Sequence, residues 1–230
     1  MSSKGGTAGA AGHRQRVIEK FRKTGGQGFF DYEYLELLLF FASPRRDVKP
    51  IAKALLAKFG SLRGVLAAET EELLQIPGIG KTTVVLLHLL QKIFVSGLYE
   101  EVREHPVSDH PLVTNSYLRW NYGNLRTEHL VFLLLDEHNR LIDEVQYTGD
   151  GSMVHCDRQE LLRSILLRRN VESVVILHNH PNGNACPSDE DLNAIRLIQN
   201  MLMTVGIRLK DALIVTAGRI MSLSKFVNHD

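Results

Sequence analysis

Two histidines and one aspartate in the C-terminal half of the chain have the residue types and spacing of a metal-binding group. His178 and His180 follow an apolar, β-branched run over 171–177, and residues two apart in a strand point to the same side, so both imidazoles face one way. Ser188 suits the N-cap of the next helix, which places the Asp191 carboxylate in its first turn, within reach of the strand end. Two imidazoles and one carboxylate leave a fourth position for water, as in catalytic zinc sites, and the set also suits ferrous iron.

Each half of this pattern also has a purely structural explanation. A His-x-His pair at a strand end is often a surface pair without a ligand, and Ser-x-x-Asp is commonly no more than a helix start. The combination is more specific, because ten residues separate His180 from Asp191 and no structural need explains that arrangement. We therefore predict a metal site.

The region after residue 112 must position these side chains. Apolar and alternating runs predict strands, and periodic segments between them predict helices. We expect strands over 130–135, 141–147, 171–177 and 213–216, and helices over 115–122, 158–169 and 188–205. Strands interspersed with helices predict an α/β or α+β domain over 113–230.

The preceding region has a helical pattern without strands. Helices are expected over 32–41, 48–59, 61–66 and 82–96, with a further short helix beginning at Thr70. We predict a disordered tail over 1–13, a helical domain over 14–99 and a polar linker over 100–112.

The segment Pro77-Gly78-Ile79-Gly80 has the form of a helix-hairpin-helix turn. Two glycines allow a close bend, and their amides, followed by a helix N-terminus, can hold a phosphate. Lys81 and Thr82 would add a charge and a hydroxyl, so Gly78, Gly80, Lys81 and Thr82 are candidate DNA-backbone contacts. The alternative is a turn that only connects two packed helices.

The motif around the metal ligands resembles a known family. His178-x-His180-Pro181 followed by Ser188-x-x-Asp191 resembles the JAMM motif of MPN-domain metallopeptidases, and His-Asn-His-Pro resembles the RadC branch in particular. The resemblance covers nearly the whole chain. It implies an MPN/JAMM-type, cytidine-deaminase-like sheet domain preceded by a small all-helical helix-hairpin-helix domain.

The resemblance also implies roles at the site. One zinc ion would be held by two histidines and one aspartate, here His178, His180 and Asp191. A glutamate would act as general base through the metal-activated water, and Glu128 is the matching residue, with Glu144 as the alternative. Ser188 would stabilise the oxyanion.

Three segments depart from the RadC-like pattern. Asp211-Ala212 stands where Asp-His is common, so a supporting role of that histidine is absent here. Segments 149–151 and 157–160 differ from the usual Gly-Thr and Pro-Arg-Glu. Because these segments are expected to border the site, we expect a different substrate preference.

Composition limits the classes of protein to consider. A formal net charge of +1 over 230 residues excludes a globally basic nucleic-acid binder. Two cysteines, Cys156 and Cys186, are too few for a disulfide framework, and we assign neither to the site. The longest apolar runs are about eight residues, and no N-terminal signal sequence is visible. We expect a soluble cytoplasmic protein without a membrane partner.

These observations favour a zinc-dependent hydrolase acting on a peptide or isopeptide, with the helical domain for targeting. One alternative is a DNA-processing protein in which the same site attacks a phosphodiester. A third is a metal-binding scaffold without catalysis. One zinc with a glutamate base suits acyl hydrolysis, whereas many nucleases hold two metals about 3.5–4 Å apart.

Overall fold

The computed structural model describes residues 6–44, 46–149 and 157–227. It contains two compact units, which we call the helical unit (residues 1–93) and the sheet unit (residues 94–230). The predicted class, a mixed α/β chain with a helical N-terminal region, is confirmed.

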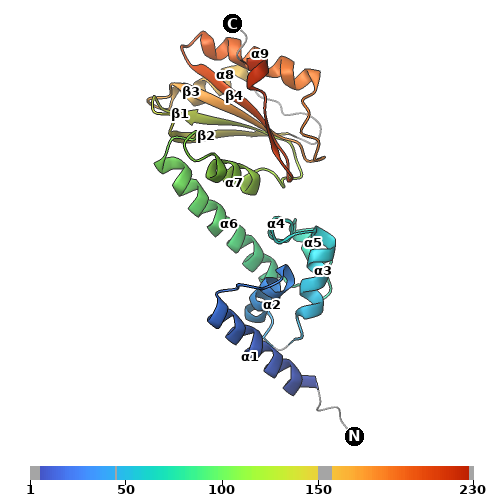
Figure 1. Ribbon diagram of the computed structural model, residues 1–230. Helices are drawn as coiled ribbons and strands as arrows, with labels where there is room; N and C mark the ends of the chain where they lie inside the picture. The colour runs from blue at the N-terminus through green and yellow to red at the C-terminus, as the bar shows by residue number, and fades with distance from the viewer. Residues whose placement is uncertain (1–5, 45, 150–156, 228–230) are drawn as a thin grey trace. The chain divides into compact units, whose positions relative to one another are not determined.

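The helical unit contains five helices and the first half of a sixth within its described residues (Figure 1). They are α1 (Gly6–Thr24), α2 (Asp31–Ala42), α3 (Lys49–Phe59), α4 (Leu62–Leu66), α5 (Thr70–Leu74) and α6 (Lys81–Glu104). Their apolar faces enclose a core that includes Leu35, Leu39, Leu55, Leu73 and Leu87. The absence of strands from the described part of this unit agrees with the sequence pattern.

Two predicted boundaries differ from the structure. Helix α1 begins at Gly6, so residues 6–13 are helical rather than a disordered tail, while 1–5 lie outside the described residues. Helix α6 continues to Glu104 and α7 begins at Pro111, so much of the predicted linker over 100–112 is helical. The polar residues of that segment form the solvated last turn of α6, which periodicity alone did not reveal.

Helix α6 is long and apolar enough to cross a membrane by length and composition alone, with a mean hydropathy of 1.4 in its most apolar window. Its first half contributes Val84 and Leu87 to the core of the helical unit. Its second half contributes Val95 and Val102 to a core of the sheet unit. Core helices pass the same test, so the criterion is weak evidence for a membrane segment.

The sheet unit is built on a five-stranded sheet of order β2-β1-β3-β4-β5. The strands are β1 (His129–Leu135), β2 (Leu141–Thr148), β3 (Ser173–Asn179), β4 (Arg208–Val215) and β5 (Ile220–Ser222). Among the strands of the described residues, β3 and β4 form the one parallel pair and the other pairs are antiparallel. The sequence pattern predicted four of these strands and missed β5, which has only three residues.

Helices cover both faces of this sheet (Figure 1). Helices α8 (Arg158–Leu166) and α9 (Asp189–Met203) lie on one face, and α7 (Pro111–Asn121) lies on the other; α10 (Ser224–Val227) follows β5. Alternate residues of β1 divide between the faces: Phe132 and Leu134 pack on the α9 side, Val131 and Leu133 on the α7 side. The connection from β3 to parallel β4 runs through α9, which brings the start of this helix to the end of β3.

Candidate metal centre

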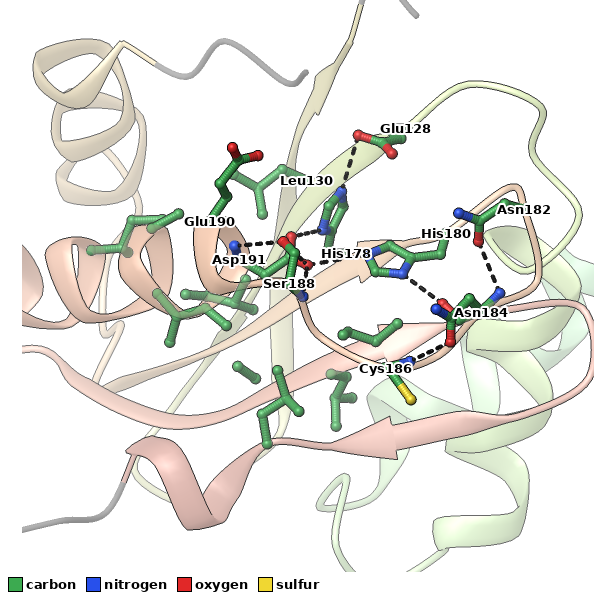
Figure 2. A pocket seen from close by; sticks show the side chains of 18 residues that line it. Glu128, Leu130, His178, His180, Asn182, Asn184, Cys186, Ser188, Glu190 and Asp191 are labelled. Atoms are coloured by element: carbon green, nitrogen blue, oxygen red, sulfur yellow. Dashed lines mark hydrogen bonds and ion pairs between the residues drawn. The ribbon is translucent and has the colours of Figure 1, made fainter. Parts of the chain in front are cut away.

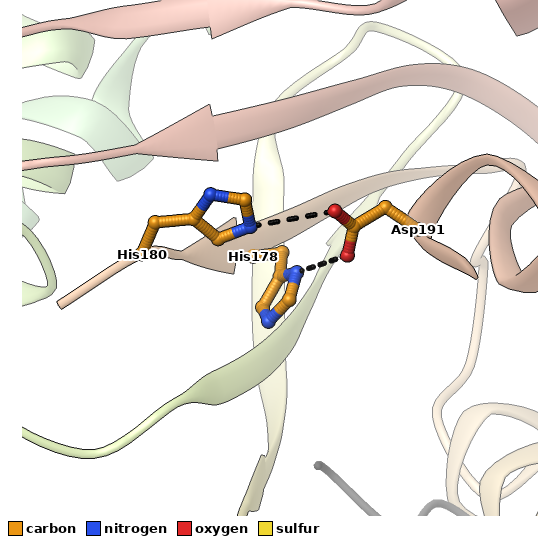
Figure 3. Close-up of side chains that lie close together, drawn as sticks. All are labelled: His178, His180 and Asp191. Carbon is orange, nitrogen blue, oxygen red and sulfur yellow. Dashed lines mark hydrogen bonds and ion pairs between the residues drawn. The ribbon is translucent and has the colours of Figure 1, made fainter. Parts of the chain in front are cut away.

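The three predicted ligands converge where β3 ends and α9 begins. His178 is the penultimate residue of β3, and His180 follows the strand, with its backbone N–H donating to the Val215 carbonyl at 3.0 Å. Figure 3 shows both imidazoles directed at the Asp191 carboxylate. One ligand atom from each of the three residues lies within 4.8 Å of the others, so that small side-chain rotations bring all three within bonding distance of one ion.

The cap of α9 sets the position of Asp191. Ser188 is the N-cap, and its hydroxyl accepts from the Asp191 N–H at 3.1 Å. In return, Asp191 Oδ2 accepts from the Ser188 N–H at 2.8 Å and from the Ser188 hydroxyl at 2.8 Å. This reciprocal cap is the predicted helix start, and it turns the carboxylate toward β3.

The same carboxylate faces both imidazoles. Asp191 Oδ1 lies 2.9 Å from His178 Nδ1, and Oδ2 lies 3.5 Å from His180 Nε2. Burial alone would raise the pKa of Asp191, but hydrogen bonds from His178 and Ser188 outweigh it and lower that pKa well below its usual range. The carboxylate is therefore ionised, which is the form that binds a cation.

The ring orientations fit metal binding. His180 Nδ1 lies 2.6 Å from the carbonyl oxygen of Asn184, so this nitrogen donates its hydrogen and Nε2 keeps a lone pair. A hydrogen bond of this kind fixes the ring of a metal-ligating histidine. His178 Nε2 is buried without a hydrogen-bond partner within the described residues, although a buried polar atom normally has one. The carboxylate nearest to this nitrogen is that of Glu128, whose Oε2 lies 3.6 Å away, and a bound metal ion would supply the partner that Nε2 lacks.

The structure places Glu128 at this site and Glu144 elsewhere. Glu128 immediately precedes β1, and its Oε2 lies 3.6 Å from His178 Nε2. Glu144 lies on β2, where hydroxyls of Tyr117, on α7, and of Tyr122 donate to it. Of the two glutamates considered as general base, only Glu128 reaches the ligand group.

These residues line a pocket of about 390 Å³ (Figure 2). Its polar side carries the ligand group, Glu128 and Ser188, and its apolar wall includes Leu130, Ile176 and Ile198. Ala212, at the position where RadC-like chains commonly have histidine, also lines this wall. The apolar wall and the Asn184 contact were missed from the sequence, because strand alternation does not reveal which core residues border a cavity.

The structure describes Cys186 but not Cys156. Cys186 is exposed and lines the pocket, and Figure 2 shows its sulfur directed away from the imidazoles. Cys156 and the segment 150–151 lie outside the described residues. Asp157, from the second departing segment, is the N-cap of α8, accepting from the Glu160 N–H at 2.9 Å.

The glycine turn of the helical unit borders a second cavity, of about 350 Å³. The four candidate contacts Gly78, Gly80, Lys81 and Thr82 all line it, together with Arg46. Gly78 has a φ of +97°, and a Cβ there would lie 2.6 Å from Ile51 Cδ1, so this position requires glycine. Gly80 has no such constraint, since nothing lies within 4 Å of a Cβ built on it.

The sheet unit, with its His-His-Asp group beside the central strand, is a JAB (MPN) domain. Residues 109–228 match the RadC-like JAB domain family, and residues 11–85 match the UPF0758 N-terminal family. The chain is 34% identical over 215 residues to UPF0758 protein FN0909 of Fusobacterium nucleatum subsp. nucleatum, covering 89% of this chain and 91% of that protein. The chain therefore belongs to the RadC-like JAB domain family. Members of the wider JAB/MPN class are usually hydrolytic and often bind zinc, and the relative's name states no activity.

Proposed function

We propose that the sheet unit is a zinc-dependent hydrolase that cleaves a peptide-like amide, with one zinc ion held by His178, His180 and Asp191. The observation that carries this proposal is the convergence of the three ligand atoms within 4.8 Å, beside a glutamate 3.6 Å from one of the imidazoles. The orphaned Nε2 of His178 supports it, because a buried ring nitrogen without a partner is costly unless a ligand satisfies it.

Zinc bound there would supply Lewis acidity, which lowers the pKa of a coordinated water to about 7 and polarises a substrate carbonyl. Glu128 acts as general base: its carboxylate takes the proton of the attacking water and passes it to the leaving amine. Its side chain is about one-quarter exposed (28%), so it faces both the ligand group and the open pocket. A single carboxylate at this position can serve both proton transfers.

Ser188 has two roles in this proposal, positioning of the Asp191 carboxylate and stabilisation of the oxyanion. Its hydroxyl donates to Asp191 Oδ2 in the present conformation, which holds the carboxylate against the imidazoles. Rotation of the hydroxyl toward the pocket redirects this hydrogen bond to the developing oxyanion. The N-cap interaction with the Asp191 N–H uses the oxygen as acceptor, so it persists in both conformations.

Zinc content per chain is the first test, measured by mass spectrometry on the purified wild type, His180→Ala and His138→Ala. His138 is a matched control because it is an exposed histidine of the same unit, with a side chain 67% accessible and no place in the pocket. We expect about one zinc in the wild type and the control, and little in His180→Ala. Equal metal in all three proteins would refute the ligand assignment.

We propose a second function for the helical unit, binding of a DNA backbone phosphate in the cavity beside Gly80. A lysine, an arginine and a run of helix N-terminal amides around one cavity support it. Lys81→Ala and Gly80→Ala should each weaken salt-dependent binding to a short DNA duplex, whereas Lys92→Ala, an exposed lysine of the same helix, should not. Unchanged binding in both cavity variants would leave the turn as a connector of helices.

A further inference from the structure

Asn179 stands between the two histidine ligands and does not face the metal group. It is the last residue of β3 and is 99% buried, so its amide must be hydrogen-bonded to be tolerated there. Both polar atoms of its side chain have partners, and both partners belong to the backbone on either side of Glu128. Asn179 Oδ1 accepts from the His129 N–H at 2.6 Å, and Nδ2 donates to the Thr127 carbonyl at 3.0 Å.

These two hydrogen bonds continue the connection between β1 and β3 beyond the last paired residues of the two strands. The pairing of β1 with β3 ends at Leu130 opposite His178. Beyond that point β3 remains paired with β4, through Asn179 opposite Val215, and β1 leaves it. The side-chain amide of Asn179 presents a donor and an acceptor as a peptide group does, so it extends the attachment of β1 to β3 by the segment that carries Glu128.

A further backbone group of this segment is also hydrogen-bonded. The Glu128 carbonyl accepts from the Gly149 N–H at 2.8 Å, on the side of β2. With Asn179 on one side and Gly149 on the other, the backbone at Glu128 has little freedom to shift. The carboxylate of Glu128 is therefore aimed at His178 by a residue that adjoins both histidine ligands in the chain.

We infer that Asn179 is a positioning residue. Its two hydrogen bonds fix the backbone of Glu128 to the strand that carries the histidine ligands, which keeps the distance between the general base and the metal site constant. This inference rests on the proposed function, since it concerns the same site. Alanine would remove both bonds. Aspartate would keep the acceptor for the His129 N–H but would place an oxygen against the Thr127 carbonyl.

The test compares Asn179→Ala, Glu128→Gln and the double variant, with Ser173→Ala as control. Ser173 is a buried polar residue at the far end of the same strand, 98% buried, whose hydroxyl has no partner within the described residues. Zinc per chain is measured first, and then the affinity of the zinc-loaded proteins for acetohydroxamate by calorimetry. This probe binds zinc and hydrogen-bonds to a neighbouring general base, so it reports on Glu128 without a known substrate.

We expect about one zinc in every protein, because Asn179 touches no ligand side chain. Acetohydroxamate should bind roughly tenfold more weakly in Asn179→Ala and in Glu128→Gln, the equivalent of one lost hydrogen bond. The double variant should bind no more weakly than Glu128→Gln alone, since Asn179 acts through Glu128. Ser173→Ala should bind as the wild type does. Wild-type affinity in Asn179→Ala, or losses that multiply in the double variant, would overturn the inference.

Amide hydrogen exchange gives a second readout that needs neither metal nor ligand. Exchange at residues 127–129 should accelerate in Asn179→Ala relative to Ser173→Ala, because the His129 N–H loses its acceptor, and to a smaller extent in Asn179→Asp, because only the bond to the Thr127 carbonyl is lost there. If the alanine variant does not fold, the exchange measurement is made on Asn179→Asp alone. Unchanged exchange there in a folded variant would overturn the inference even with zinc bound. Absence of zinc from the wild type would instead count against the proposed function.

Discussion

Glu128 and Glu144 lie near neighbouring strands of one sheet, but on opposite faces and in opposite surroundings. On the α9 face, Glu128 borders an open pocket and its carboxylate contacts an imidazole at 3.6 Å. On the α7 face, Glu144 is closed in beneath Tyr117 and Tyr122, whose hydroxyls satisfy it. The difference teaches that a half-buried carboxylate whose oxygens accept hydroxyl hydrogen bonds is part of the architecture, whereas a carboxylate that faces a pocket and an unpartnered ring nitrogen is available for chemistry.

The largest expected difference between the two carboxylates is in turnover. Glu128→Gln keeps shape and removes the base, so hydrolysis of any peptide-like substrate that the wild type cleaves should fall by about 10²–10⁴-fold. Its unfolding free energy should stay within about 0.5 kcal/mol of the wild type. Glu137→Gln, at an exposed turn of the same unit, is the control and should retain turnover. Full turnover in Glu128→Gln would remove Glu128 from the role of base.

Removal of the metal should lower the thermal stability of the protein only through the ligand group on the α9 face. A ligand that binds only the folded state adds about 4 kcal/mol when present at a thousand times its Kd. Chelation should therefore lower the thermal midpoint of the wild type, measured by calorimetry, and leave that of His180→Ala unchanged. An equal decrease in both proteins would mean that the stabilising metal binds elsewhere.

A substitution on the α7 face should change the stability of the protein and leave its metal content unchanged. Glu144→Ala leaves the hydroxyls of Tyr117 and Tyr122 without their acceptor in a buried position, at a cost of about 1–3 kcal/mol each. We expect a decrease of about 2–6 kcal/mol in the free energy of unfolding, measured by urea denaturation. Zinc content should be unchanged, and a loss of zinc in the folded variant would contradict the separation of the two faces.

Ser188→Ala belongs to the metal face and should have a smaller effect on stability. Loss of the N-cap of α9 costs about 1 kcal/mol. Ser61 is a matched control, because it caps α4 through the same type of bond, to the Gly64 N–H at 3.0 Å. Both alanine variants should lose similar stability, but only Ser188→Ala should also bind zinc more weakly, since Asp191 loses a hydrogen bond. Equal zinc affinity in the two would limit Ser188 to capping.

The smallest expected effect is on the pH dependence of stability. Burial raises the pKa of Glu144, and hydrogen bonds from Tyr122 and Tyr117 offset this only in part. The folded state therefore binds the proton more tightly than the unfolded state, so this group lowers stability as pH rises from about 4 toward its folded pKa. Glu144→Gln should gain stability relative to the wild type over that range and show a constant difference below it. A difference that shrinks as pH rises would contradict this direction.

The sequence predicted the parts of the site that depend on local spacing. His178, His180 and the capped Asp191 could be placed because strand alternation and a helix start act over a few residues. Glu128 could be chosen over Glu144 only through the family resemblance, since one precedes a strand, the other lies in a strand, and the faces of both depend on the β1–β2 register. The role of Asn179 could not be read from the sequence, because its partners are 50 and 52 residues away.

The short strand β5 and the true extents of α1 and α6 were also beyond the sequence pattern. Three residues are too few for alternation to be recognised in β5. The glycine- and alanine-rich start of α1 reads as a tail, because its composition lacks an apolar face. The last turn of α6 is polar and solvated, so it reads as a linker.

The separation of the site residues along the chain has a consequence for folding order. His178 and Asp191 are 13 residues apart, whereas the Glu128 segment reaches β3 from about 50 residues upstream. Each doubling of a loop adds about 0.6 kcal/mol to its closure, so the short ligand loop closes first at the lower entropic cost. The loop between the proposed ligands can therefore close before β1 docks with the Glu128 segment that precedes it, so we expect metal binding to come before assembly of the complete site during folding.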